Sequence, residues 1–353
     1  MSRLLWLVLV VLLSVNLTAQ PGGAHTYTFL KLPPSSRITA LGGALITVRD
    51  ADVALAVQNP AALNASAHRG ISFQHNFHFD GIYNGYASYG HHLEASGITL
   101  HGGIQFMQYG SFDLADELGN VLGTFNANEL ALTVGASREI GGRMSVGGNL
   151  RFIQSNLESY QSSALAADIG GMVWNDEKQL SAALVVRNVG VMLSSYSDDV
   201  KEDLPIDIQL GVSKRLQHLP FRLSITAHSL NRWNLYYDSP LDDTQTSLIG
   251  NDPVEKSQFS RELDNFFRHF IFSGEFLLGQ EENLKLRFGY HHQRRKELSL
   301  ASLRSFAGFS LGFGLQIKQF TIDYGFGAYH IAGSTQHVGI STNLGRFGKG
   351  ILD

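Results

Sequence analysis

Residues 206–214 read IDIQLGVSK, and residues 283–291 read NLKLRFGYH. In both stretches apolar and polar side chains alternate with a period of two, so a β-strand would carry them on opposite faces. A strand with this pattern has one apolar and one polar surface along its whole length. The second stretch separates into an apolar row and a mostly basic row: Leu284, Leu286, Phe288 and Tyr290 opposite Lys285, Arg287 and His291.

About 14 segments of this kind follow one another after residue 70. Each is roughly 9–14 residues long, the length with which a tilted strand crosses a bilayer, whereas strands of soluble proteins have about 5–6 residues. The pattern therefore predicts an all-β fold, a transmembrane antiparallel β-barrel of about 14 strands over residues 70–345. The predicted strands are 71–79, 82–90, 97–108, 128–139, 143–154, 161–174, 179–188, 206–216, 220–229, 269–278, 283–293, 304–317, 319–330 and 336–344.

The connections between these segments alternate in length. Short ones such as NDEK (175–178) and GQEE (279–282) are typical of periplasmic turns, and long ones are typical of extracellular loops. The first hairpin is an exception, because Asp80-Gly81 is a short turn on the side predicted to be outside. The alternative fold is a soluble β-sandwich, in which the apolar rows would form the buried face. The long loops predicted outside are 109–127, 189–205, 230–268 and 294–303.

The N-terminus and the composition indicate export to a membrane. Residues 1–19 have the order of a signal peptide, with Arg3, an apolar run and small residues ending at Ala19. Charged residues make up 16% of the chain, fewer than in soluble domains, and the absence of cysteine excludes disulfides and cysteine metal sites. A net charge of −4 gives no indication of a nucleic-acid partner. We predict a multi-pass protein of the bacterial outer membrane, in contact with the lipid bilayer.

Residues 20–69 do not alternate, and we predict a periplasmic or plug segment with short helices there, while residues 346–353 form a C-terminal tail. Gly42-Gly43 permits a sharp turn. Asp52 can cap a helix that begins at the next residue, and Asn59-Pro60 has the residue types of an N-cap and a first helical position. On spacing alone, an ordinary helical linker is the alternative.

Charged residues on the polar rows would face the lumen of the barrel. They would either pair with one another and with the N-terminal segment as a plug, or line a water-filled channel, and plug pairing is our prediction. These residues are Arg143, Arg151, Asp168, Arg187, Asp207, Arg222, Glu275, Lys285, Arg287 and Asp323.

No catalytic residue, cofactor or metal site is predicted. Residues 308–312 match G-x-S-x-G, but that motif requires a strand-to-helix turn, and here it lies within an alternating stretch. The chain has 14 histidines, of which His75 and His78 would lie on opposite faces of one strand. The adjacent pairs 91–92 and 291–292 are split across faces in the same way, so we predict solvated or interfacial histidines.

The stretch TFLKLPPSSRITALGGALITVRDADVALAVQNPAAL (28–63) resembles the N-terminal signature of the PorV/PorQ family of type IX secretion system outer-membrane proteins. That signature reads F-L-x-L-P-x-S-A-R-x-x-A-L-G-G, followed by acidic residues and N-P-A; Ser36 departs from it, as does the chain end GRFGKGILD. The N-P-A element is also similar to that of FadL-type 14-stranded barrels. Stretches 109–125, 264–277 and 283–290 resemble PorQ-like chains. The motif residues are Arg37, Gly42, Gly43, Asp52, Asn59 and Pro60.

The resemblance implies a non-enzymatic barrel of the type IX secretion system of Bacteroidota. Such a barrel would anchor a PorZ-like surface protein, together with other components of the attachment complex. The alternative is a FadL-like outer-membrane transporter of hydrophobic molecules. The predicted partner-binding residues are Arg232, Trp233, Tyr236 and Tyr237, whose types are enriched at interface hot spots. They lie in the long loop, which could instead form a lid over the mouth of the barrel.

Overall fold

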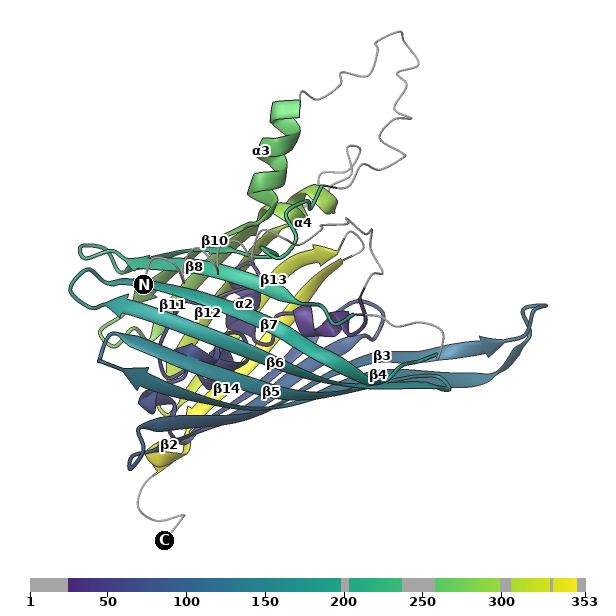
Figure 1. The fold of residues 1–353 in the computed structure, drawn as a ribbon, viewed down its shortest axis with the longest axis horizontal. Coiled ribbons are helices and arrows are strands. Elements are labelled where there is room, and N and C mark those ends of the chain that lie inside the picture. Colours follow the sequence, from purple (N-terminus) through teal and green to yellow (C-terminus); the bar gives the residue numbers. More distant parts are fainter. Residues whose placement is uncertain (1–24, 198–202, 237–257, 299–305, 331–332, 348–353) are drawn as a thin grey trace, which may run out of the picture.

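The computed structural model describes residues 25–197, 203–236, 258–298, 306–330 and 333–347. The predicted signal peptide and Tyr237 lie outside these residues. Fourteen antiparallel strands form a single closed barrel within the described part, because the first strand pairs with both the second and the last (Figure 1). The predicted fold class is confirmed.

The strands agree with the predicted segments in number and order. Their bounds are β1 Gly70–Phe77, β2 Tyr83–Leu93, β3 Ile98–Ala115, β4 Val121–Ile140, β5 Met144–Leu157, β6 Tyr160–Asn175, β7 Leu180–Ser194, β8 Asp207–Arg215, β9 Phe221–Ala227, β10 Phe270–Leu278, β11 Leu284–His291, β12 Phe309–Ile317, β13 Phe320–His330 and β14 Gly333–Asn343.

The wall of the barrel is polar inside and apolar outside. On β14, Val338 and Ile340 are each 43% exposed, whereas Thr335 and His337 are only 2% and 0% exposed. The same division holds on β11, where Leu286 is exposed and Arg287 is buried. A soluble β-sandwich requires the opposite arrangement, so that alternative is wrong. An apolar outer wall with every strand edge paired is the arrangement that a lipid bilayer requires.

The two ends of the barrel differ. The turn end carries only short connections, such as 94–97, 141–143 and 279–283, while the loop end carries the connections 195–206, 228–269 and 292–308. Two predicted long loops are wrong in part. Most of 109–127 belongs to the β3–β4 hairpin, which extends beyond the other strands (Figure 1), and β7 continues to Ser194.

These two predictions were wrong because the alternation of apolar and polar side chains shifts by one position within the strand. The β3–β4 pairing shifts register between Gln108 and Ser111, where Gly110 has a φ of 85°, so the alternation is interrupted while the pairing continues. A similar irregularity lies between β6 and β7 beside Asn188, which has a φ of 58°. The strand predicted at 283–293 ends at His291, since a helix begins at the next residue.

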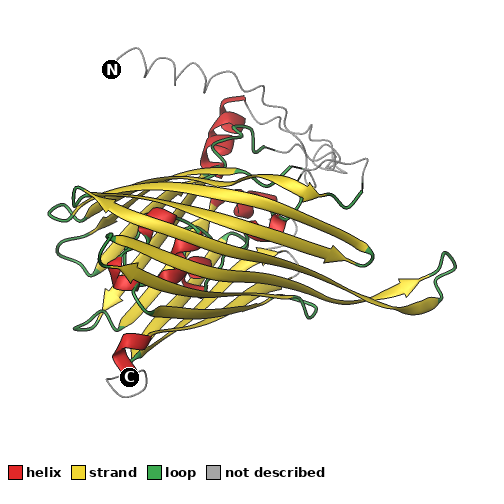
Figure 2. Cartoon of the chain, turned by 60° about the horizontal axis from the view of Figure 1, so that its bottom comes forward, coloured by secondary structure: helices red, strands yellow, loops and turns green. Residues whose placement is uncertain are grey.

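The N-terminal segment lies inside the barrel. Its helices contact strands on several sides of the wall, and Figure 2 shows them enclosed by the strands. Ile38, Leu41, Leu45, Val48 and Leu55 form a small buried core within this segment. This segment therefore occupies the lumen as a plug, one of the two arrangements, periplasmic or plug, that the sequence allowed. The helices of the segment are η1 Thr28–Lys31, α2 Ser36–Ala40, η2 Val53–Val57, η3 Pro60–Ala62 and η4 Ala65–Ala67.

Within the described ranges, three further helices lie outside the lumen. They are α3 Gln258–Arg268, which projects from the loop end (Figure 1), α4 His292–Glu297, and η6 Leu344–Phe347 after the last strand. No helix among the described residues is both long enough and apolar enough to cross a membrane.

Candidate functional site: the filled lumen and a groove at its rim

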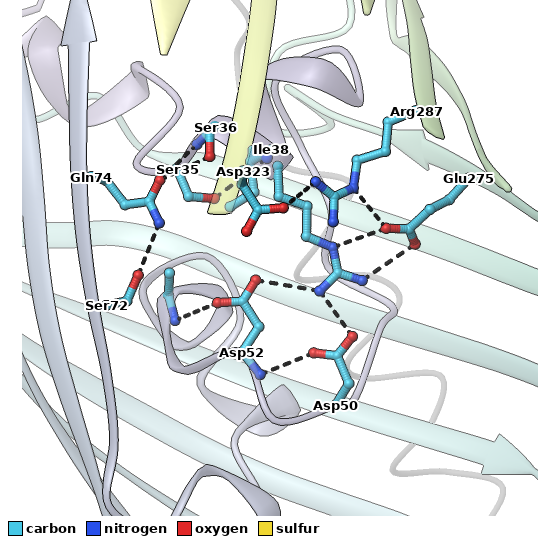
Figure 3. A network of polar contacts seen from close by, with 12 residues as sticks. Ser35, Ser36, Ile38, Asp50, Asp52, Ser72, Gln74, Glu275, Arg287 and Asp323 are labelled. Carbon is cyan, nitrogen blue, oxygen red and sulfur yellow. Dashed lines mark hydrogen bonds and ion pairs between the residues drawn. The ribbon is translucent and has the colours of Figure 1, made fainter. Parts of the chain in front are cut away.

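A buried network of charges joins the N-terminal segment to the barrel wall (Figure 3). Arg37, on α2, is 3% exposed and contacts Asp50 at 2.8 Å, Asp52 at 3.3 Å and Glu275 of β10 at 3.2 Å. Glu275 also binds Arg287 of β11 at 2.9 Å. A guanidinium group with several donors suits such a multiple contact with carboxylates.

Two further residues extend the network around the wall. Arg222 of β9 contacts Glu275 at 2.8 Å, and Asp323 of β13 contacts Arg287 at 2.5 Å. Three guanidinium groups and four carboxylates thus meet inside the barrel. The plug pairing predicted for the lumen charges is confirmed for this group, because the alternative, a row of solvated charges along an open channel, would leave the carboxylates free of Arg37.

The pKa values of Asp50 and Asp52 shift in opposite directions. Burial is the largest single influence and by itself raises the pKa of Asp50, but Arg37, Lys285 and Arg222 together outweigh burial, so that the pKa falls below its ordinary value. For Asp52 burial dominates and raises the pKa of the carboxyl. Asp52 also caps η2, as predicted, by accepting a hydrogen bond from the backbone N–H of Ala54 at 3.1 Å. Asp50 is therefore the stronger ionic partner of Arg37.

A second buried ion pair lies in a different part of the barrel wall, on β5 and β6. Arg151 of β5 donates to Asp168 of β6 at 2.7 Å and to the side chain of Asn188 on β7 at 2.5 Å. Asn149 donates both to Asp168 at 3.2 Å and to the backbone carbonyl of Ala56 in the plug at 3.0 Å. The predicted lumen charges of this group also pair, and they reach the plug through an amide.

The Asn59-Pro60 element is held against β5 and β6. The Asn59 side chain accepts from the N–H of Ala61 at 2.9 Å and donates to the carbonyl of Ile46 at 2.6 Å, so it caps η3 as predicted and also ties this helix to the backbone at Ile46. The wall carries glycines here. A Cβ at Gly147 would lie 2.6 Å from the Pro60 carbonyl carbon, and one at Gly170 would lie 2.2 Å from Asn59 Oδ1.

The Gly42-Gly43 turn is also confirmed. The two residues have φ values of 88° and 106°, which residues with a Cβ rarely adopt. Gly289 of β11 faces this turn, and a Cβ there would lie 2.2 Å from the Gly42 nitrogen. All six motif residues therefore act within the plug and at its contact with the wall. The wall glycines were missed in the sequence, although glycine-rich strands such as 147–148 and 170–171 are a visible signal.

An apolar groove of about 600 Å³ opens at the loop end, between the start of the plug and the base of the β3–β4 hairpin. Phe112 and Phe125 stack with ring centres 5.3 Å apart on one side. Tyr109 and Glu129 form a hydrogen bond of 2.5 Å and supply a polar edge. Tyr109, Phe112 and Phe125 fell in the region 109–127 that was predicted to be a loop, so the sequence did not reveal the groove. The lining residues are Thr26, Tyr27, Thr28, Tyr109, Phe112, Phe125, Ala127, Glu129, Leu157 and Tyr196.

Of the predicted partner-binding residues, Arg232, Trp233 and Tyr236 are described and lie at the loop end, where Trp233 and Tyr236 contact α3. Trp233 is 53% exposed and stacks on His269 with ring centres 5.1 Å apart. The Arg268 guanidinium lies 4.9 Å from the centre of the Tyr236 ring. Arg232 is half-buried, and its backbone N–H donates to the carbonyl of Ser229. Their role in binding a partner stays a prediction.

The prediction of solvated or interfacial histidines is wrong for several positions. His101, His228, His269, His291 and His337 are all at most 7% exposed. They lie on the inner side of the wall or at its rim, where the plug and the loops exclude water. The described residues contain no group of three or more side chains placed to hold a metal ion.

No family model matches the sequence, and no curated protein matches it. Among solved structures, a Pseudomonas aeruginosa FadL homologue is 9% identical with a TM-score of 0.50, over 88% of this chain and 98% of that chain. This chain has the fold of a bacterial outer-membrane β-barrel. The TodX monoaromatic hydrocarbon channel (a deltaS2 mutant) is 12% identical with a TM-score of 0.48, over 87% of this chain and 96% of that chain. The CymD monoaromatic hydrocarbon channel is 13% identical with a TM-score of 0.48, over 88% of this chain and 96% of that chain.

Proposed function

We propose that this barrel binds a small hydrophobic molecule in the rim groove and carries it across the outer membrane, with the loop end facing outward. The observation that carries this proposal is the groove itself, an apolar, aromatic-walled site beside the first residues of the plug. Binding sites for small molecules are typically concave and mostly apolar, with a few polar groups that fix orientation, and the Tyr109–Glu129 pair would serve that purpose. The FadL-like fold is consistent with such a role.

The position of the groove suggests how binding would reach the lumen. Tyr27 lines the groove and also donates a hydrogen bond to Ser162 of β6 at 2.9 Å. Phe29 and Leu30, the next apolar residues, pack with Met107 and Ile153 in a buried cluster on the inner wall. A molecule that enters the groove would therefore compete with the start of the plug for the same apolar wall. Movement of this segment would open the way inward.

The test measures binding of a dansyl-labelled fatty acid to the purified barrel, with toluene as a competitor. Phe112→Asp places an unpaired charge in the groove and should weaken binding at least about tenfold, because desolvating such a charge costs several kcal/mol. Leu118→Asp is the matched control, since Leu118 lies on the same hairpin and is 88% exposed. Equal binding by both variants would contradict the groove as the site.

A second candidate function is the one that the sequence resemblance implies, the anchoring of a PorZ-like surface protein of a type IX secretion system. Two observations favour it. All six residues of the motif lie within the plug, which occupies the lumen, and Trp233 is exposed at the loop end of the barrel. Under this proposal the filled barrel provides a fixed attachment to the membrane and the loops provide recognition.

Fractionation of cells distinguishes the two functions. Trp233→Ala with Tyr236→Ala should release the surface partner into the culture fluid while the fatty-acid probe still binds. If transport is the function, Phe112→Asp should weaken binding of the fatty-acid probe and leave the surface partner on the membrane. Retention of the partner in a strain that lacks the barrel would end the anchoring proposal.

A further inference from the structure

Helix α3 presents its apolar side outward and its polar side to the protein. Phe259, Leu263, Phe266 and Phe267 share one face of this helix, because they are spaced four, three and one residues apart. All four are exposed, from 38% for Phe267 to 73% for Phe259. An amphipathic helix of a soluble protein turns such a face inward.

Hydrogen bonds on the opposite face fix the rotation of the helix. The Asn265 side chain donates to the carbonyl of Trp233 at 2.8 Å and accepts from the N–H of Leu235 at 2.8 Å. Asp264 contacts His292 and Lys296 of α4 at 3.0 and 3.2 Å. Turning the aromatic face inward would break all of these contacts, so its exposure is a built feature of the fold.

The aromatic face continues the outer wall of the barrel. Ile271, Ser273 and Glu275 of β10 are buried, so Phe270 and Phe272 lie on the other, outward side of the strand. Phe266 lies 4.9 Å from Phe270, and Phe270 lies 6.1 Å from Phe272, measured between ring centres. A single apolar stripe thus runs from the bilayer-facing strand onto α3.

We propose that α3 is a membrane-surface helix that lays its aromatic face into the adjoining lipid leaflet beside the barrel. The occupant is lipid, because the stripe is continuous with a surface that already faces acyl chains. Helices of this type insert an apolar face about 5–10 Å deep and keep their charges on the other side. Lys296 of α4, whose side chain is exposed, stands on the polar side at the same rim, where headgroup phosphates would lie. The helix would then fix the start of β10 at the height of the membrane surface.

Site-directed spin labelling tests this directly, since the chain has no cysteine. The full-length protein would carry a single nitroxide after Leu263→Cys or Phe267→Cys, with Arg261→Cys as the matched control on the opposite face of α3. Each variant is reconstituted in vesicles of palmitoyl-oleoyl phosphatidylcholine, and heat-modifiable migration on gels confirms that the barrel has folded. Leu286→Cys on the outer wall and Gln217→Cys in a turn give the lipid and aqueous reference values.

The measurement is collision with oxygen, which partitions into lipid, against collision with a water-soluble nickel chelate. Labels at 263 and 267 should resemble the label at 286, with an oxygen-to-nickel ratio several-fold above that of 261. A ratio at 263 and 267 equal to that of 217 would overturn the proposal, because the face would then lie in water. Low collision with both reagents would also overturn it, since the face would then be covered by protein.

Discussion

Glu275 is a wall residue at the centre of the charge network that holds the plug. Its carboxylate contacts Arg37, Arg222 and Arg287, and it is 2% exposed. Glu275→Gln keeps the shape of the side chain but removes the charge that these guanidinium groups share. Breaking a buried pair on one side costs about 3–5 kcal/mol, because it leaves uncompensated charge in a site with little water. We expect a loss of that order in the free energy of unfolding, measured by urea titration in vesicles.

The matched control is Glu177→Gln at the turn end. Glu177 lies 3.9 Å from Arg143, and their side chains are 83% and 70% exposed. Solvent and salt screen such a pair, so this change should cost less than about 1 kcal/mol. Equal unfolding midpoints for the two variants would show that the Glu275 carboxylate does not hold the plug.

At the level of single residues, the sequence indicated which residues hold the plug better than it indicated which residues contact one another. Arg37, Asp52 and Asn59 stood out through the motif, and the lumen charges stood out through alternation. That the lumen charges pair with the plug was predicted, but which residue pairs with which could not be, because Arg37 and Glu275 are 238 positions apart and meet only when the barrel closes around the plug. The buried histidines were misjudged for the same reason, since their environment depends on a segment distant in sequence.

At the level of elements, the two rows of a strand should differ in their tolerance to charge. Leu286→Arg places a guanidinium on the lipid-facing row of β11, where Leu286 is 43% exposed. Arginine near the bilayer midplane costs about 2–4 kcal/mol on the lipid face of a barrel. We expect this variant to unfold at a lower urea concentration and to fold less completely, as measured by heat-modifiable migration.

Leu118→Arg is the control for this change. Leu118 is 88% exposed and lies at the tip of the β3–β4 hairpin, which extends beyond the other strands (Figure 1). It should fold as the wild type does. Arg287→Leu, on the inner row, should be as damaging as Leu286→Arg for a different reason, since Arg287 holds Glu275 and Asp323. If Leu286→Arg is harmless, the assignment of the outer row is wrong.

The elements themselves were largely predictable, because a period of two repeats in every strand and is broken by turns. The errors lie where a bulge changes the phase, as beside Gly110, or where a helix such as α4 follows a strand without a turn residue. The rim groove could not be predicted, because it lies at the base of the β3–β4 hairpin. The interrupted alternation in this hairpin led to the prediction of a loop there.

At the level of the whole molecule, the filled lumen predicts a closed pore. A barrel of this strand number is wider than the eight-stranded barrels that side chains alone can fill, so the plug occupies space that would otherwise hold water. The wild type should show no stable conductance in planar lipid bilayers, whereas deletion of residues 30–66 should produce stepwise channel openings. Similar currents from both proteins would show that the plug does not seal the barrel.

Locking the plug to the wall separates the two proposed functions. The hydroxyl of Thr47 in the plug is hydrogen-bonded to that of Ser213 on β8, and the chain has no other cysteine with which a new pair could mispair. Thr47→Cys with Ser213→Cys should therefore form a disulfide that ties the N-terminal segment to the barrel. If transport requires this segment to move, oxidised barrels should bind the fatty-acid probe but fail to pass it into vesicles, and a reductant should restore uptake; single-cysteine variants are the controls. Uptake that persists under oxidation would contradict a route through the lumen. Anchoring requires no movement, so a surface partner should remain on the membrane whether the disulfide is closed or open.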